Sequence, residues 1–182
     1  MLEALREALE RPWRPLSRPA LAAWLVFYAL FLLYALAARG GYLFIDNVNL
    51  VVHEGGHALF GWFGETLGLM GGTLFQLLVP LLLATYFFFQ RQTAATAFCS
   101  FFFFENFLPI ATYMADARAQ QLPLVSIGGG EDVEHDWFVM LSRVGLLQWD
   151  TRLALAVRLL GWAGMLATVG WLAWRTRAAE RS

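Results

Sequence analysis

The stretch ALAAWLVFYALFLLYALAA, at residues 20–38, determines the class of this protein because it contains no charged residue. A helix needs about 20 mostly apolar residues to cross a bilayer, since the hydrocarbon core is about 30 Å thick and each residue advances about 1.5 Å. A helix of this length in the core of a soluble protein would keep a polar face, and residues 20–38 have none. We therefore predict an integral, multi-pass membrane protein whose first span is 20–38.

The overall composition supports this interpretation and restricts the partners. Hydrophobic residues make up 59% of the chain and charged residues 15%, whereas average soluble domains carry about 25% charged residues. The net charge of −1 gives no reason to expect nucleic acid as a partner. We expect membrane lipid around the chain and a membrane protein or a peptide as its substrate.

Further apolar segments follow the first one along the chain. They lie at about 43–63, 74–89, 93–115 and 152–174. We therefore predict an all-α fold, a bundle of about five transmembrane helices that forms a single membrane domain over 1–182. The second, third and fourth spans, within 43–118, would form the core that carries the functional site.

The segments that flank the spans have their own patterns. Residues 1–19 begin with leucines spaced to share one helical face, which predicts an amphipathic helix lying on the membrane surface. Glycines predict a turn at 64–72 between the second and third spans. The polar loop 119–150 is expected to contain a short interfacial helix near 137–147.

Arginines provide the evidence for orientation. With five spans, six arginines would lie on the side of the N-terminus, namely Arg6, Arg11, Arg14, Arg18, Arg118 and Arg143. Five would lie on the other side, namely Arg39, Arg91, Arg175, Arg177 and Arg181. Because basic residues favour the cytoplasmic side, this small difference predicts a cytoplasmic N-terminus in a plasma membrane or a bacterial inner membrane.

The motif His53-Glu54-Gly55-Gly56-His57 in the second apolar segment predicts a metal site. Residues i and i+4 share one face of a helix, so the imidazoles of His53 and His57 can reach one metal ion. Imidazole ligands with an open position are typical of catalytic Zn²⁺, and Glu54 is placed to take a proton from zinc-activated water. Each ionisable group costs at least about 2.5 kcal/mol to insert into a membrane, so this cluster indicates a compensating cation.

A catalytic zinc site needs a third protein ligand, and the fourth predicted span offers candidates. Polar residues at steps of three or four, from Glu105 to Asp116, share one face of this helix. Such a stripe cannot face lipid, so we expect it to face the helix that carries the two histidines. Asp116, at the end of the stripe, is the favoured third ligand, and Glu105 is a further candidate.

His135 competes for the same position. The chain has only three histidines, so all three can be expected to meet at one metal ion. The glycines at 128–130 precede His135 and would let the loop fold back toward the membrane. Three interpretations remain open: His135 binds the metal, lies beside the site without binding it, or belongs to an exposed acidic loop.

These motifs resemble those of the site-2 protease family of intramembrane zinc metalloproteases. The HEGGH sequence matches the H-E-x-x-H motif of that family, and Asn106 and Pro109 match the start of its N-x-x-P-x-x-x-L-D-G motif. The resemblance covers about 45–118 and implies that Asp116 is the third ligand. It also implies that Asn106 holds the substrate backbone or the developing oxyanion. The chain departs from the pattern, because Ala117 follows Asp116 and Asp116 lies farther from Asn106 than in the family.

We therefore expect an intramembrane zinc metallopeptidase of the H-E-x-x-H type, with Glu54 as the general base. Two other functions remain open. One is a non-catalytic zinc-binding membrane subunit, in which His135 or loop carboxylates close the coordination sphere. The other is a small metal-ion carrier or chaperone, with the acidic residues at 131–136 as its entry.

Overall fold

The computed structural model describes residues 2–38, 42–124 and 134–179, and all regular secondary structure within these ranges is helical. The prediction of an all-α fold is confirmed. The glycines at 128–130, the first acidic residues of 131–136, Arg39 and Arg181 lie outside the described residues.

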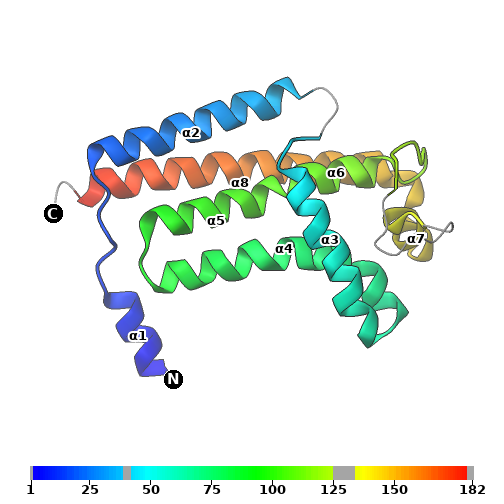
Figure 1. Cartoon of the computed structure of the whole chain (residues 1–182), viewed down its shortest axis with the longest axis horizontal. Coiled ribbons are helices and arrows are strands. Elements are labelled where there is room, and N and C mark those ends of the chain that lie inside the picture. The colour runs from blue at the N-terminus through cyan, green and yellow to red at the C-terminus, as the bar shows by residue number, and fades with distance from the viewer. Residues whose placement is uncertain (1, 39–41, 125–133, 180–182) are drawn as a thin grey trace.

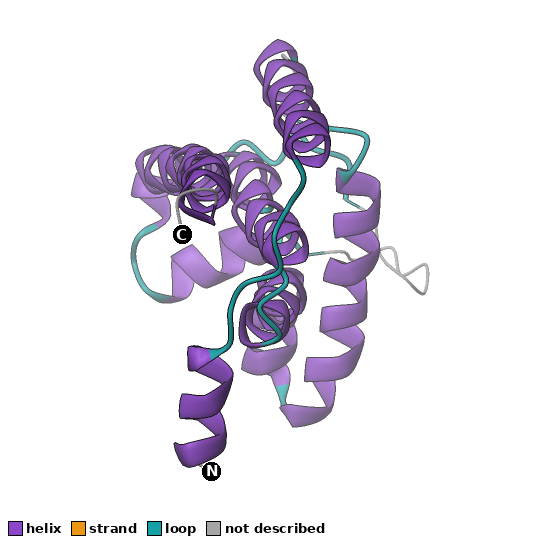
Figure 2. Cartoon of the chain, turned by 90° about the vertical axis from the view of Figure 1, so that its left-hand side faces the viewer, coloured by secondary structure: helices purple, strands orange, loops and turns teal. Residues whose placement is uncertain are grey.

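Four helices are long and apolar enough to cross a membrane, by length and composition. They are α2 (Arg18–Ala37), α4 (Glu65–Phe89), the pair α5 (Thr93–Glu105) and α6 (Phe107–Ala115), and α8 (Asp150–Ala179). They lie along the long axis of the molecule (Figure 1), and Figure 2 views them from the end that carries both termini. These helices correspond to the first, third, fourth and fifth predicted spans.

The second predicted span is shorter than expected. It contains α3 (Asp46–Phe60), which the 3-10 turn η1 (Gly61–Phe63) joins to α4. A helix of 15 residues is about 22 Å long, less than the roughly 30 Å of a hydrocarbon core. α3 crosses the long helices at an angle and packs against α4 (Figure 1). The prediction of five spans is therefore corrected to four candidates among the described residues.

The glycines of 64–72 pack two helices together instead of forming a turn. Only Gly64 lies in the turn, with a φ of 109°, and α4 already begins at Glu65. A Cβ atom added to Gly56 would lie 2.2 Å from the carbonyl oxygen of Gly71. The backbones of α3 and α4 therefore touch, and small residues are what allow this approach. The predicted turn over 64–72 is wrong for this reason.

The fourth predicted span is interrupted at Asn106, where α5 ends and α6 begins. Pro109 explains the break, because it has no N–H group and its ring would clash with the carbonyl group four residues earlier, that of Glu105. The side chain of Asn106 donates a hydrogen bond to the carbonyl oxygen of Phe102 at 2.7 Å. The break redirects α6 toward the end of the molecule where α3 and α7 lie (Figure 1).

Short helices lie at the two ends of the bundle. The N-terminal segment forms α1 (Leu2–Glu10), as predicted, and the Arg91 guanidinium donates to its last turn, at Ala8. At the opposite end, α7 (Asp136–Arg143) and the 3-10 turn η2 (Leu147–Trp149) replace the single helix predicted near 137–147. Both chain termini lie at the α1 end (Figure 1).

Two apolar clusters hold the helices together. The larger one contains the fully buried side chains of Tyr28, Phe101 and Met165, which join α2, α5 and α8. The smaller one joins α6, α7 and α8 and includes Ala111 and Leu141. This second cluster positions α7 beside the helices that carry the candidate site.

Candidate metal centre

Two histidines on α3 face α4, and the partners of their Nδ1 atoms fix their orientation. His57 Nδ1 lies 2.8 Å from the backbone carbonyl oxygen of Gly68. His53 Nδ1 lies 3.1 Å from the side-chain oxygen of Gln76. Because these oxygens only accept hydrogen bonds, each Nδ1 carries a proton, and in the neutral ring each Nε2 then presents a lone pair.

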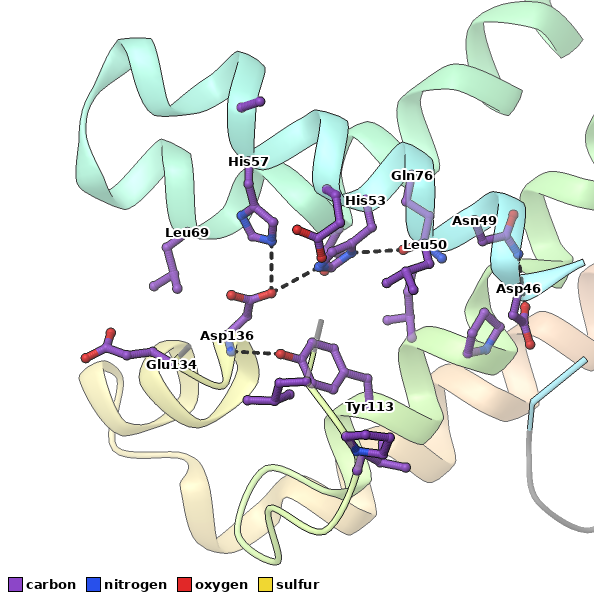
Figure 3. A pocket seen from close by; sticks show the side chains of 18 of the residues that line it. Asp46, Asn49, Leu50, His53, His57, Leu69, Gln76, Tyr113, Glu134 and Asp136 are labelled. Atoms are coloured by element: carbon purple, nitrogen blue, oxygen red, sulfur yellow. Dashed lines mark hydrogen bonds and ion pairs between the residues drawn. The ribbon is translucent and has the colours of Figure 1, made fainter. Parts of the chain in front are cut away.

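The two Nε2 atoms converge on one carboxylate, that of Asp136 at the start of α7. Asp136 Oδ2 lies 3.0 Å from His53 Nε2 and 3.1 Å from His57 Nε2 (Figure 3). All three atoms are acceptors when the imidazoles are neutral, so either a proton on an imidazole or a bound metal cation must join them. The hydrogen bond to Asp136 raises the pKa of His57 to about 9. Among the described residues, these three form the one group of histidine, cysteine and carboxylate ligands that could hold a metal ion.

The dimensions of this group fit zinc. Zn²⁺ binds imidazole nitrogen and carboxylate oxygen at about 2.0–2.2 Å, which places the ligand atoms of one tetrahedron about 3.3 Å apart. The observed separations from Asp136 Oδ2, 3.0 and 3.1 Å, are close to this value. Two imidazoles and one carboxylate also leave one position of a tetrahedron open, as catalytic zinc sites do.

Gly72 on α4 makes room for the two imidazoles. A Cβ atom at this position would lie 2.4 Å from His53 Nε2 and 2.5 Å from His57 Nε2. Real Cβ atoms essentially never come so close to other heavy atoms, so a larger residue at 72 would displace both rings. The glycine pattern that suggested a turn in the sequence therefore serves the histidine pair.

Glu54 belongs to the same site through a cavity of about 800 Å³. The cavity runs between α3, α4 and α6, and its lining includes Glu54, His53, His57 and Asp136. Tyr113 of α6 also lines it, and its hydroxyl oxygen accepts a hydrogen bond from the backbone N–H of Asp136 at 3.1 Å. The three residues expected from the HEGGH motif are thus brought together at a cavity large enough for a peptide segment.

The structure places Asp116 and His135 next to each other and outside the group of three ligands. Asp116 Oδ1 and Oδ2 each accept a backbone N–H bond of 3.0 Å, from Gln121 and Leu122. Asp116 Oδ2 also lies 3.6 Å from His135 Nε2. The other ring nitrogen of His135 accepts a hydrogen bond from the backbone N–H of Phe138 at 3.3 Å and so caps α7. Burial lowers the pKa of His135 despite the nearby carboxylates, so the ring is neutral at pH 7.

Glu105 and Asn106 lie away from the histidines. Glu105 is fully buried and its Oε2 accepts a hydrogen bond from the Asn49 side chain at 3.1 Å. Asn106 is 3% exposed and its amide nitrogen is bound to Phe102. Neither residue is among those that line the cavity, so the structure does not place Asn106 where the resemblance expects it.

Asp136 is the ligand candidate that sequence reasoning missed. Asp136 directly follows His135 and is one of several acidic residues in 131–136. The sequence does not distinguish it from the other carboxylates of this run. The acidic run itself was a signal, since its carboxylates are possible ligands in the non-catalytic alternative. The position of Asp136 at the first turn of a helix capped by His135 could not be read from spacing alone.

Comparison of the chain with protein families, with curated proteins and with solved structures found no match.

Proposed function

We propose that this protein is an intramembrane zinc metallopeptidase in which His53, His57 and Asp136 hold the metal. The observation that carries the proposal is that the Nε2 atoms of His53 and His57 lie 3.0 and 3.1 Å from one carboxylate oxygen of Asp136, at the wall of a cavity. A zinc ion bound there supplies a Lewis acid that lowers the pKa of water and polarises a carbonyl group. In this proposal Asp136 replaces Asp116, the predicted third ligand.

The side chains around the ligands have separate roles in peptide hydrolysis. Glu54 lines the cavity and acts as the general base that removes a proton from the attacking water and returns it to the leaving amine. Tyr113 replaces Asn106 as the donor to the developing oxyanion. Its hydroxyl oxygen accepts the Asp136 N–H, which leaves the hydroxyl proton available for a substrate oxygen.

The proposed membrane topology has four spans instead of five. With four spans both termini lie on one side, together with seven described arginines: Arg6, Arg11, Arg14, Arg18, Arg91, Arg175 and Arg177. Arg118, Arg143 and Arg152 lie toward the other side. The positive-inside rule then favours a cytoplasmic N-terminus much more clearly than the earlier count did. The metal centre lies toward the opposite, extracytoplasmic side.

Cysteine labelling tests this topology, because Cys99 is the only cysteine and is buried. In a Cys99→Ser background, Gln148→Cys and Glu10→Cys place single exposed thiols at the two ends of the bundle. In intact cells a membrane-impermeant maleimide should label position 148 and should label position 10 only after permeabilisation. The reverse pattern would contradict the orientation.

A metal-ion carrier is the second candidate, and one observation favours it. The lining of the cavity includes the carboxylates of Glu54, Glu65 and Glu134 in addition to the ligand Asp136. Acidic walls would attract a cation toward the histidines. Peptide hydrolysis needs Glu54 as a base, whereas transport needs only its charge, so an isosteric amide at this position separates the two functions.

The Glu54→Gln variant tests the proposed function. We expect it to retain one zinc per chain and normal thermal stability, because Glu54 is not one of the three ligands. Profiling of new protein N-termini in membranes should detect cleavage products in cells that make the parent protein and not in cells that make the variant. Identical profiles, or loss of zinc from the variant, would contradict the peptidase assignment.

A further inference from the structure

We propose that Asp116 and His135 form a positioning pair, which fixes the N-terminus of α7 and thereby holds Asp136 at the metal. The inference rests on the metal centre proposed above and not on peptidase activity. It gives a structural role to two residues that the sequence suggested as ligands.

The need for such a pair arises from the way α7 is attached. α7 is a helix of eight residues, and its first residue supplies the third ligand. Leu141 of α7 packs in the cluster with Ala111 and Met114. This contact anchors the middle of the helix. The first turn requires contacts of its own, because a ligand must be held to within about 0.5 Å to bind a metal well.

His135 provides these contacts from the position just before α7. It is 3% exposed, and its Nδ1 accepts the Phe138 N–H, which satisfies a free donor of the first turn. The proton of the neutral ring is then on Nε2, which lies 3.6 Å from Asp116 Oδ2, an electrostatic contact longer than a hydrogen bond. The ring also packs on Tyr113, with 4.2 Å between ring centroids. Nδ1 therefore forms a hydrogen bond within the protein, whereas the buried Nε2 has the contact with Asp116 but no hydrogen bond to the described residues.

Asp116 is the fixed end of the pair. Its two carboxylate oxygens accept the N–H groups of Gln121 and Leu122, so the carboxylate is locked to the turn after α6. This carboxylate contacts His135, which directly precedes Asp136. In addition, the hydroxyl oxygen of Tyr113 accepts a hydrogen bond from the backbone N–H of Asp136. The end of α6 thus determines where the Asp136 carboxylate lies, although Asp116 does not touch the metal.

Two substitutions of His135 separate its contacts. The side-chain oxygen of Asn can replace Nδ1 as the helix cap, but Asn cannot reach Asp116. The amide nitrogen of Gln can replace Nε2 and donate to Asp116. We expect His135→Asn to lower zinc affinity about 10-fold, the lower end of the range for loss of a partner that orients a ligand. Asp116→Asn should cause a similar loss, and His135→Gln should restore most of the affinity.

The decisive measurement combines His135→Asn with Asp136→Ala and determines zinc affinity by competition with a chelator. If His135 acts through Asp136, His135→Asn lowers affinity in the parent and has no further effect in the Asp136→Ala background. Cobalt(II) substitution supplies a second readout, since the visible spectrum of His135→Asn should change toward that of Asp136→Ala.

Each other outcome overturns the inference in a recognisable way. Equal losses in both backgrounds would mean that His135 does not act through Asp136. Loss of zinc in His135→Gln and His135→Asn alike, with no effect of Asp136→Ala, would make His135 the ligand and would refute the proposed centre as well. A lower unfolding temperature of the metal-free variants with unchanged zinc affinity would show that the pair only stabilises the fold.

Discussion

The α3–α4 hairpin and α7 contribute to the same centre in different ways. The hairpin supplies His53 and His57 from one helix, and the contact between Gly56 and Gly71 joins that helix directly to its neighbour. α7 supplies Asp136 from the first residue of a short helix, and side-chain contacts hold it in place. Two of the proposed ligands are therefore held by backbone packing, whereas the third depends on a few polar and aromatic contacts.

The two regions should therefore respond differently to substitution. Substitutions of the glycines at the α3–α4 contact should displace the backbone or both imidazoles at once and remove the metal or the fold. Changes around α7 should displace one ligand and weaken binding by a limited factor.

Gly72→Ala should remove most of the bound zinc. The new Cβ atom would lie within 2.5 Å of the Nε2 atoms of His53 and His57, so both imidazoles would have to rotate away from Asp136. Elemental analysis of purified protein measures the effect. Gly55→Ala is the matched control in the same motif, because its Cβ atom would make an ordinary contact of 3.8 Å with Phe75. Retention of one zinc per chain in Gly72→Ala would contradict the geometry.

Gly56→Ala should destabilise the hairpin itself. Its Cβ atom would lie 2.2 Å from a backbone oxygen of α4, and forcing an extra methyl group into a packed interface costs about 1–3 kcal/mol. We expect the thermal unfolding midpoint in detergent to fall by about 5 °C. Gly170→Ala on α8, which has no atom within 4 Å of the new Cβ, should leave the midpoint nearly unchanged. Equal midpoints for the two variants would show that α3 and α4 do not pack this closely.

Gln76→Ala should lower zinc affinity about 10-fold, because it removes the acceptor that orients His53. Gln76→Glu keeps an acceptor oxygen at the same place and should retain the affinity. Competition with a chelator measures both variants. An alanine variant that binds zinc as tightly as the parent would show that backbone packing alone orients the histidine.

Arg143→Gln should have the smallest effect. Arg143 forms an ion pair with Glu65, but the two side chains are 44% and 82% exposed, and exposed ion pairs contribute less than about 1 kcal/mol. We expect less than a fivefold change in zinc affinity. A change as large as that of His135→Asn would mean that α7 is held by its exposed end instead of its buried first turn.

The sequence was sufficient for the class of fold and for the helix that carries His53 and His57. The apolar stretch 20–38 predicts a long helix, and α2 (Arg18–Ala37) confirms it. His53 and His57 share a face because the spacing within one helix fixes their relation. Such relations within one helix can be predicted from the sequence, because regular helix geometry determines which residues share a face.

Relations between distant segments were not accessible in this way. Asp136 and His57 are separated by 79 positions, and nothing in the spacing shows which carboxylate of the acidic run meets the histidines. Gly71 and Gly72 were interpreted as a turn, because glycine is typical of turns and of close helix packing alike. The break at Asn106 was also missed, although Pro109 indicates it.

The position of a bound metal ion relative to His53, His57 and Asp136 decides whether the proposed centre is correct. In a crystal of the zinc-loaded protein, an anomalous difference map at the zinc absorption edge locates the ion independently of the surrounding atoms. The account predicts one peak within about 2.2 Å of His53 Nε2, His57 Nε2 and a carboxylate oxygen of Asp136, with His135 directed at Asp116. A peak bound by His135 or Asp116 in place of Asp136 would contradict it.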